Sequence, residues 1–360
     1  MGSGSPGDAR RRRTGRSGGR GRSSLILTIT RECDLRCSYC PTVKEGWPSL
    51  DPAQIERAIA LFCDRFGGGD VKLFGGEPLL FPALVDAALE AAQRDPRVHR
   101  IYLSTNGLGL DEARLERLAR EPKLVLTVSM DGEPADHRRL RRPLNVVDGE
   151  TTRDAYAHLR ALMPTLRRMP RAVVTQTIAP ATAARAARNF AHLRQLGWWR
   201  FNLLPGYYLP WRAEQLTDLR EGFAEIGRDI RRAWAEGERL YVRNLFTLAP
   251  TPFFNVGMVV DSDGSIHASN VGLASSMSEL LDVTRVGSLD DPPSREALSA
   301  SAAELPRLLE ETVPAPILES TRAVDAALSA LVRDLYPAYL RARARRRASA
   351  VALGAPGGAA

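Results

Sequence analysis

Hydrophobic residues along this chain alternate between short continuous runs and longer stretches with helical spacing. Segment 24–30 (SLILTIT) is apolar and β-branched, which is typical of a buried strand. In 52–66, Ile55, Ile59 and Phe62 recur at helical spacing, and glycines follow the last of them. The first unit of the chain is therefore predicted to be a strand, a loop and a helix.

The same alternation continues through the first two thirds of the chain. Strands are predicted at 24–30, 71–74, 100–104, 124–129, 172–178 and 200–204. Helices are predicted at 52–66, 82–94, 111–120, 152–166, 182–196 and 213–236. Six strand–helix units favour an α/β fold with a parallel sheet whose outer face is covered by helices, a partial (βα)6 barrel.

The alternation stops near residue 240. Residues 258–268 read as a β-hairpin around the turn 261–264 (DSDG), 292–316 is broken by Pro and Ser, and a last helix is expected at 320–347. We therefore expect a barrel at 24–239 followed by a small α+β subdomain at 240–348. Disordered tails are expected at 1–23 and 349–360.

The net positive charge of the chain lies mainly in its two ends. The 360 residues carry a formal net charge of +8, but seven arginines lie in 1–23 and five in 341–360, which leaves a mildly acidic body. An arginine-rich tail can bind RNA by releasing counterions, or it can be a solvated terminus. We favour the solvated terminus and do not expect nucleic acid as a partner.

No window approaches the roughly 18 consecutive apolar residues of a membrane span, and the N-terminus lacks the apolar segment of a secretory signal. We therefore expect a cytoplasmic protein without a membrane partner.

Three of the four cysteines, Cys33, Cys37 and Cys40, fall within eight residues directly after the first predicted strand. Loops at the carboxyl ends of parallel strands build the active sites of such folds. Three thiolates without a neighbouring histidine suit an iron–sulfur cluster, or a zinc site that lacks one ligand. Cys63 has helical spacing with Ile59, which indicates a buried structural thiol.

The spacing Cys-x3-Cys-x2-Cys, with Tyr39 before the last cysteine, resembles the signature of the radical S-adenosylmethionine (radical SAM) enzymes. Gly75-Gly76-Glu77-Pro78, after the second predicted strand, resembles the GGEP motif that holds the methionyl amino group in that family. Glycines there allow close approach of the backbone, and the glutamate can accept hydrogen bonds from an ammonium group.

Two later strand ends extend the resemblance. Ser104-Thr105-Asn106-Gly107 is similar to the TNG corner of the family, so Ser104 and Asn106 join the expected cofactor contacts. The run from Ser129 through Asp131 to Arg141 resembles that of peptide-modifying members. By this resemblance Ser129 and Asp131 would reach the ribose side of S-adenosylmethionine, and Arg141 its carboxylate.

The resemblance implies one [4Fe–4S] cluster on Cys33, Cys37 and Cys40, with S-adenosylmethionine on the remaining iron. One-electron reduction would cleave S-adenosylmethionine to a 5′-deoxyadenosyl radical that abstracts a hydrogen atom from the substrate. A flavodoxin- or ferredoxin-type electron donor is the implied partner.

The hairpin at 258–268 resembles the opening of the SPASM-type domain of peptide- and protein-modifying members, where cysteines bind further clusters. Ser269 stands where such a cysteine is expected, and no cysteine follows Cys63. The subdomain is therefore expected to be free of clusters.

Three functions stay open at this point. The first is a radical SAM enzyme acting on a peptide or protein in peptide natural-product maturation, with a separate peptide-recognition protein as a possible partner. The second is the same chemistry on a small metabolite such as a sugar, nucleotide or amino-acid derivative. The third is an RNA-associated iron–sulfur protein.

Overall fold

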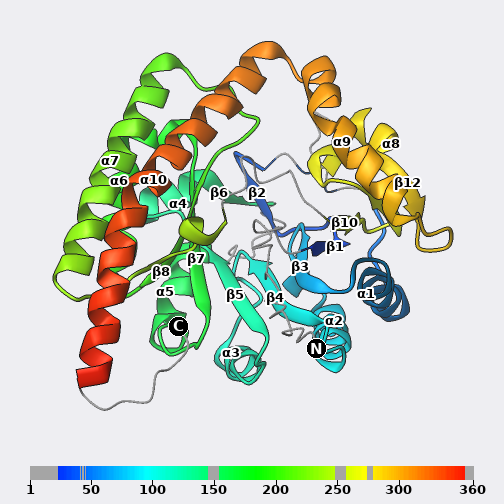
Figure 1. Ribbon diagram of the computed structural model, residues 1–360, viewed down its shortest axis with the longest axis horizontal. Coiled ribbons are helices and arrows are strands. Elements are labelled where there is room, and N and C mark those ends of the chain that lie inside the picture. The colour runs from blue at the N-terminus through cyan, green and yellow to red at the C-terminus, as the bar shows by residue number, and fades with distance from the viewer. Residues whose placement is uncertain are drawn as a thin grey trace, which may run out of the picture.

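The computed structural model describes residues 23–352, except 41, 43, 45, 145–153, 248–256 and 274–278. A curved, mostly parallel sheet forms its centre, and helices follow one another along the outer side (Figure 1). The strands are β1 Ser24–Thr30, β2 Leu35–Cys37, β3 Gly69–Gly75, β4 Val98–Thr105, β5 Leu124–Ser129, β6 Arg141–Pro143, β7 Ala172–Ile178, β8 Arg200–Pro205, β9 Tyr241–Val242, β10 Gly257–Val260, β11 Ser265–His267 and β12 Arg285–Ser288. The helices are α1 Pro52–Phe66, α2 Pro82–Arg94, α3 Glu112–Ala119, α4 Pro134–Leu140, α5 Ala155–Leu166, α6 Ala186–Gln195, α7 Ala213–Ala235, α8 Glu279–Thr284, α9 Arg295–Thr312 and α10 Ala315–Ala352.

The strand order confirms the α/β class and the parallel sheet. It runs β12-β11-β10-β1-β3-β4-β5-β7-β8-β9, with β1 parallel to both β3 and β10. All seven residues of β1 are buried, because the strand has a neighbour on each edge and packing on both faces. The six predicted strands are β1, β3, β4, β5, β7 and β8, so their carboxyl ends meet at one end of the sheet.

Local sequence explains how the first helix is positioned. The Asp51 side chain accepts from the Gln54 amide, and the Gln54 side chain accepts from the Asp51 amide, which forms a capping box before α1. Gly67 ends the helix in the left-handed conformation. Phe62 and Cys63, on the inner face of α1, are buried in the main core.

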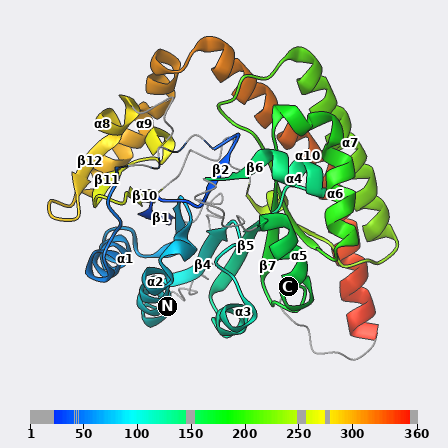
Figure 2. The same ribbon diagram turned by 180° about the vertical axis from the view of Figure 1, so that it is seen from behind.

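The segments after residue 240 border the sheet at both ends. β9 pairs with β8 at one edge, whereas β10, β11 and β12 extend the sheet beyond β1 at the other. Helices α9 and α10 run between these two sides, and α10 packs along α7 (Figures 1 and 2). The domain boundary expected near residue 240 therefore lies within one shared sheet and stays a prediction.

Several predicted elements differ from the structure. The segment 292–316 contains α9, which begins at the N-cap Ser294 and buries Leu298, Leu305 and Leu309 despite the internal Pro306. Tertiary packing of this apolar face outweighs the proline, which removes one backbone hydrogen bond. The helix expected at 182–196 is a 3₁₀ turn, Pro180–Arg185, followed by α6.

The last helix is longer than the sequence predicts. α10 begins at Ala315, earlier than expected, and continues to Ala352. The expected tails otherwise lie outside the described residues, as do the first residues of the helix predicted at 152–166. None of the described helices is both long and apolar enough to cross a membrane.

Candidate functional site

The three clustered cysteines lie in a loop that a short β-ribbon holds in place. β2 pairs antiparallel with β6, so that Cys37 lies opposite Arg141. The Ser38 amide donates to the Leu140 carbonyl at 2.8 Å, and the Leu144 amide donates to the Asp34 carbonyl at 2.9 Å. The ribbon therefore fixes the cysteine loop to the segment that follows β5 and α4.

All three cysteines of the loop are half-buried free thiols. Cys33 and Cys37 pack against a small apolar cluster of Leu35, Leu108 and Ala155. Burial raises the pKa of the Cys33 thiol to about 11 and also raises the pKa of Cys37. The Cys40 amide donates to the Cys37 carbonyl at 3.0 Å, which closes the turn between these two residues.

This donor set fits an iron–sulfur cluster better than a single ion. Among the described residues, no three Cys, His, Asp or Glu side chains are grouped closely enough to hold one metal ion. In a multi-iron cluster each thiolate binds a different iron, so the ligands surround a volume and need not converge on one point. Three thiols in one braced loop match that requirement, whereas a structural zinc ion needs four converging ligands.

Gly75, the last residue of β3, and Gly76 after it let the end of the strand approach the start of the cysteine loop. The Gly76 amide donates to Thr30 and the Glu77 amide donates to Glu32, both at 2.8 Å. A Cβ atom on Gly76 would lie 2.0 Å from the Glu32 carbonyl oxygen, and one on Gly75 would lie 2.0 Å from that of Thr30. Only glycine permits this contact, and Gly75 also has a φ of 132°.

Glu77 is a buried carboxylate with three internal donors. It accepts from the Leu79 amide at 3.0 Å, from the Thr105 hydroxyl at 2.7 Å and from the Asn106 amide at 2.6 Å. Burial raises its pKa to about 7, against the effect of these hydrogen bonds. Glu77 thus joins the ends of β3 and β4, and Pro78 begins the short 3₁₀ turn that follows it.

Asn106 continues this connection to the cysteine loop. Its side-chain amide donates to Asp34 Oδ1 at 2.6 Å, and its own Oδ1 accepts from the Leu108 amide at 2.9 Å. The corner after β4 is therefore joined directly to the residue that follows Cys33. Ser104, in β4, is half-buried and pairs in register with Thr127.

A second polar cluster lies at the end of β5. Asp131 is 1% exposed and accepts from Arg141 Nε at 2.8 Å and Nη2 at 3.2 Å, from Tyr39 at 3.0 Å and from the Thr177 amide at 3.1 Å. The Asp131 amide donates to His137 Nδ1 at 3.3 Å. Burial lowers the pKa of His137 to about 4, so this ring is neutral at pH 7. Both carboxylate oxygens of Asp131 are thus engaged within the protein.

The Nη1 group of Arg141 is not part of the ion pair with Asp131. Its Nη1 lies 3.9 Å from Cys37 Sγ, and its guanidinium lies 5.4 Å from the centre of the Tyr39 ring. Ser129, at the end of β5, is half-buried and pairs in register with Thr175. The structure therefore brings Tyr39, Asp131 and Arg141 together beside Cys37, while Glu77 and Asn106 lie on the Cys33 side of the loop. Direct contacts of these residues with a cofactor stay predictions.

Sequence reasoning missed two positively charged residues at this loop. Lys44 is buried and donates to the Leu35 carbonyl. Arg31, which directly follows β1, is fully buried and pairs with Asp261 in the turn after β10. An arginine at the end of an otherwise apolar strand was the available signal, but its partner lies too far along the chain to be found by spacing.

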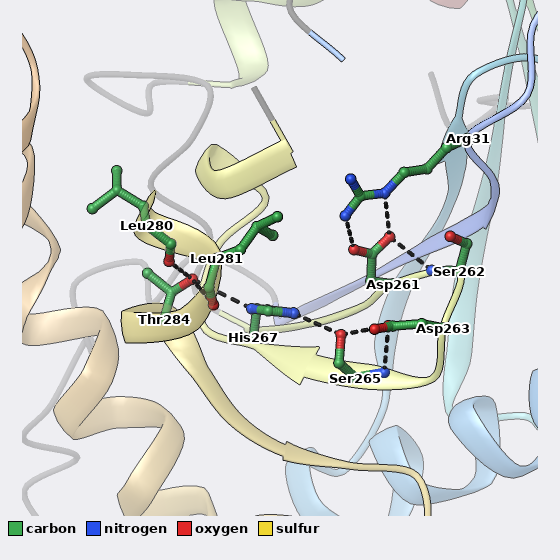
Figure 3. Close-up of polar contacts among 9 residues, drawn as sticks. All are labelled: Arg31, Asp261, Ser262, Asp263, Ser265, His267, Leu280, Leu281 and Thr284. Carbon is green, nitrogen blue, oxygen red and sulfur yellow. Dashed lines mark hydrogen bonds and ion pairs between the residues drawn. The ribbon is translucent and has the colours of Figure 1, made fainter. Parts of the chain in front are cut away.

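The hairpin after residue 257 is stabilised by polar contacts within itself (Figure 3). Asp263 Oδ1 accepts from the Ser265 amide and hydroxyl, and Ser265 Oγ lies 2.8 Å from His267 Nε2. On its other side His267 meets the Thr284 hydroxyl at the end of α8. The Asp261–Gly264 segment is a turn, as predicted, since the Gly264 amide donates to Asp261. Ser269 accepts from the Val271 amide at 3.2 Å.

A known family and several named sequences match the first part of the chain. The family described as "Radical SAM superfamily" matches residues 27–170. "GTP 3',8-cyclase" of Mycolicibacterium smegmatis is 36% identical over 124 residues, which cover 33% of this chain and 34% of that protein. The enzyme of the same name from Mycobacterium marinum is 36% identical over 140 residues, 36% of this chain and 38% of that one. The chain thus matches only about a third of the length of these relatives.

Solved structures share the fold over most of the chain. "Native anSMEcpe with bound AdoMet and Kp18Cys peptide" has a TM-score of 0.61 at 18% identity and covers 78% of this chain and 82% of that one. "Streptococcus suis SuiB bound to precursor peptide SuiA" has a TM-score of 0.53 at 14% identity, covering 83% and 66%. At these identities the likeness is one of fold.

Proposed function

Because residues 27–170 belong to the radical SAM superfamily, we propose that this protein is an enzyme that holds one [4Fe–4S] cluster on Cys33, Cys37 and Cys40 and cleaves S-adenosylmethionine reductively. The observation that carries the proposal is the braced loop of three thiols at the carboxyl end of β1. When bound, cluster and S-adenosylmethionine supply one-electron chemistry that removes a hydrogen atom from an unreactive C–H bond.

The protein's own residues bind and orient the cofactors in this proposal. Carbonyl groups of the half-buried Gly75–Gly76 backbone and the Glu77 carboxylate would accept hydrogen bonds from the ammonium of S-adenosylmethionine. Arg141 would face its carboxylate with Nη1, because Nε and Nη2 are taken by Asp131. Ser104, Asn106, Ser129 and Tyr39 complete the proposed contacts.

Asp131 has a second role in this scheme. Its carboxylate oxygens already accept from Arg141, Tyr39 and the Thr177 amide. It therefore holds the arginine in place, and any bond to the ribose would share an oxygen that is already engaged. Burial of this pair strengthens the orientation, since its polar groups have few competing waters.

We propose a peptide or protein as the substrate. Two observations support this: the hairpin of β10 and β11 resembles that of peptide-modifying members, and the likeness to peptide-bound anSMEcpe covers 78% of this chain. A nucleotide is the second candidate, because the sequence relatives are named GTP 3',8-cyclase. That match covers only 33% of this chain, so it bears on cofactor binding more than on the substrate.

The proposal also includes partners and a location. A flavodoxin- or ferredoxin-type protein would supply the electron, and a separate peptide-recognition protein would deliver a peptide substrate. We place the reaction in the cytoplasm, where the reducing environment keeps the three thiols free of disulfides.

The central test is anaerobic reconstitution with iron and sulfide, followed by dithionite and S-adenosylmethionine. We expect the wild-type protein to release 5′-deoxyadenosine and Cys37→Ala to release none. Cys63→Ala is the matched control, because Cys63 is buried in α1 and outside the loop. A wild-type protein without product, or equal product from Cys37→Ala, would contradict the assignment.

The identity of the substrate is tested by measuring release of 5′-deoxyadenosine, the product used in the first test. GTP and peptides encoded beside the gene of this protein are added separately to the reconstituted enzyme. A peptide that accelerates 5′-deoxyadenosine release and gains or loses mass supports the first candidate. Acceleration by GTP alone would overturn the peptide proposal in favour of the nucleotide.

A further inference from the structure

Arg31 is a buried charge at the entrance to the cysteine loop. It directly follows β1, lies two residues before Cys33 and is 0% exposed. Its Nε donates to Asp261 Oδ1 at 3.2 Å, and its Nη2 pairs with the other carboxylate oxygen (Figure 3). Trp47 covers the guanidinium, with 3.4 Å between Cζ and the ring centre. Such a two-point pair fixes the direction of the side chain as well as its charge.

The backbone of Arg31 is held as closely as its side chain. A Cβ atom on Gly76 would lie 2.4 Å from the Arg31 carbonyl oxygen, so the two backbones are in direct contact. Thr30 and Glu32, on either side of Arg31, accept the amides of Gly76 and Glu77. Arg31 thus connects β1, the end of β3 and the first cysteine.

Contacts within its own turn orient the Asp261 side chain. It lies just after β10, whose residue Val260 pairs in parallel register with Leu27 of β1. The Asp261 amide donates to the Ser265 carbonyl at 2.9 Å, and its Oδ1 accepts from the Ser262 amide at 2.7 Å. The turn therefore presents the carboxylate in one direction, towards the end of β1.

The rest of the hairpin is equally constrained. The exposed Asp263 and the buried Ser265, His267 and Thr284 form a continuous series of polar contacts that joins the turn to α8. No cysteine lies in this part of the chain, so the hairpin holds no cluster of its own. The many polar contacts of this hairpin therefore serve a purpose other than cluster binding.

We propose that the hairpin of residues 257–267 positions the cysteine loop through the Asp261–Arg31 pair. Asp261 neutralises and orients Arg31, Arg31 fixes the backbone that leads into Cys33, and the thiols are thereby held ready for the cluster. Arg31 and Asp261 are positioning residues, and the proposal rests on the proposed function only in naming the cluster as what the loop receives. A buried ion pair in place of an apolar contact fits this role, because such pairs specify geometry more than they add stability.

The test uses the cluster-free full chain and the variant Asp261→Asn, which keeps the shape of the side chain and removes its charge. Alkylation of each cysteine by iodoacetamide is followed by peptide mapping. We expect Cys33, Cys37 and Cys40 to react faster than in the wild type, on the order of tenfold, because the loop opens more often. Cys63 in α1 is the internal reference and should not change. In the reconstituted protein, a chelator should bleach the variant's cluster faster by a similar factor.

Asp263→Asn is the matched control, because it removes the same charge from the same turn but its carboxylate accepts from Ser265 and not from Arg31. Unchanged loop reactivity in a folded Asp261→Asn protein, or an equal increase in Asp263→Asn, would overturn the proposal. If Asp261→Asn does not fold, Trp47→Leu uncovers the guanidinium and leaves the ion pair, and should give a smaller increase at the same three thiols. No increase there would equally overturn it.

The two proposals can fail separately. The alkylation rates are measured without a cluster, so they test the role of the hairpin even if the wild type releases no 5′-deoxyadenosine. A wild type that is active, with an Asp261→Asn variant that matches it in every rate, would leave the proposed function standing and remove this inference.

Discussion

Asp131 and Arg141 form a buried two-point ion pair in which Nε and Nη2 of the arginine lie 2.8 and 3.2 Å from the two carboxylate oxygens. Arg141 also lies opposite Cys37 in the β2–β6 ribbon. The position of a cysteine is therefore linked to the end of β5 by one side-chain pair and one strand pair. The strand pair joins residues 104 positions apart, whereas the side-chain pair joins residues only 10 positions apart.

Removing the charge of Asp131 should be costly. Asp131→Asn leaves the Arg141 guanidinium, 8% exposed, without its counter-charge. We expect the free energy of unfolding to fall by about 3 kcal/mol, as for other buried pairs that lose one partner. Urea denaturation of the cluster-free protein at pH 7 measures this loss. Glu133→Gln is the control, because its partner Arg188 is 69% exposed, and it should cost less than about 1 kcal/mol. Equal losses in the two variants would refute the special role of Asp131.

Glu77 should make stability depend on pH. Burial raises its folded-state pKa from 4.5 to about 7, so the protonated form is favoured in the folded protein. This contribution to stability is complete below pH 4.5 and is lost as the pH rises through 7. Glu77→Gln is neutral throughout, so the stability of the wild type relative to this variant should fall by up to about 3 kcal/mol between pH 4.5 and 8. Urea denaturation of both proteins across this range measures it, and a difference that does not vary with pH would rule out the shift.

Gly76→Ala should disrupt the contact between β3 and the cysteine loop. The added methyl group would lie 2.0 Å from the Glu32 carbonyl oxygen, so one backbone must move. We expect a loss of about 3 kcal/mol in unfolding free energy and poor cluster retention. Gly237→Ala is the comparison: it has a φ of 83° and open space around it, so it should cost only about 1 kcal/mol of backbone strain. Chemical denaturation and iron content distinguish the two, and a Gly76→Ala protein that behaves like Gly237→Ala would contradict the close contact.

Cys63→Ala should leave the iron content unchanged. Cys63 is 1% exposed within the main core, and its substitution by alanine leaves a small cavity. We expect a loss of about 1 kcal/mol in stability with full reconstitution. Iron analysis and thermal unfolding measure the two effects. A loss of bound iron would make Cys63 part of the metal site.

Sequence patterns predicted the six parallel strands and the strand ends that carry the site, because strand burial and glycine-bearing corners leave local signals. They did not predict the β2–β6 ribbon, since β2 is only three residues long and its partner strand lies beyond α4. The resemblance to radical SAM motifs also predicted Glu77 and Asp131 as site residues, but not the internal donors that occupy their carboxylates.

The sequence also did not predict the contacts that the C-terminal residues make with the cysteine loop and the core. Arg31 is close to Cys33 in sequence, yet its partner Asp261 directly follows β10, a strand that pairs with β1 across most of the chain. Helix α9 was missed for a local reason, because Pro306 and the serines around it weaken the helical pattern that its buried leucines restore. Long-range pairing and packing of this kind leave no periodic signal.

The place of β10 beside β1 sets an order of events during synthesis. β1 leaves the ribosome well before β10, so one edge of β1 stays unpaired until residues 257–260 follow. Pairing of strands so far apart in sequence is slow, because a long loop must close first. The Asp261–Arg31 pair is therefore completed late, and iron delivered to the nascent chain would meet three thiols that still lack this support.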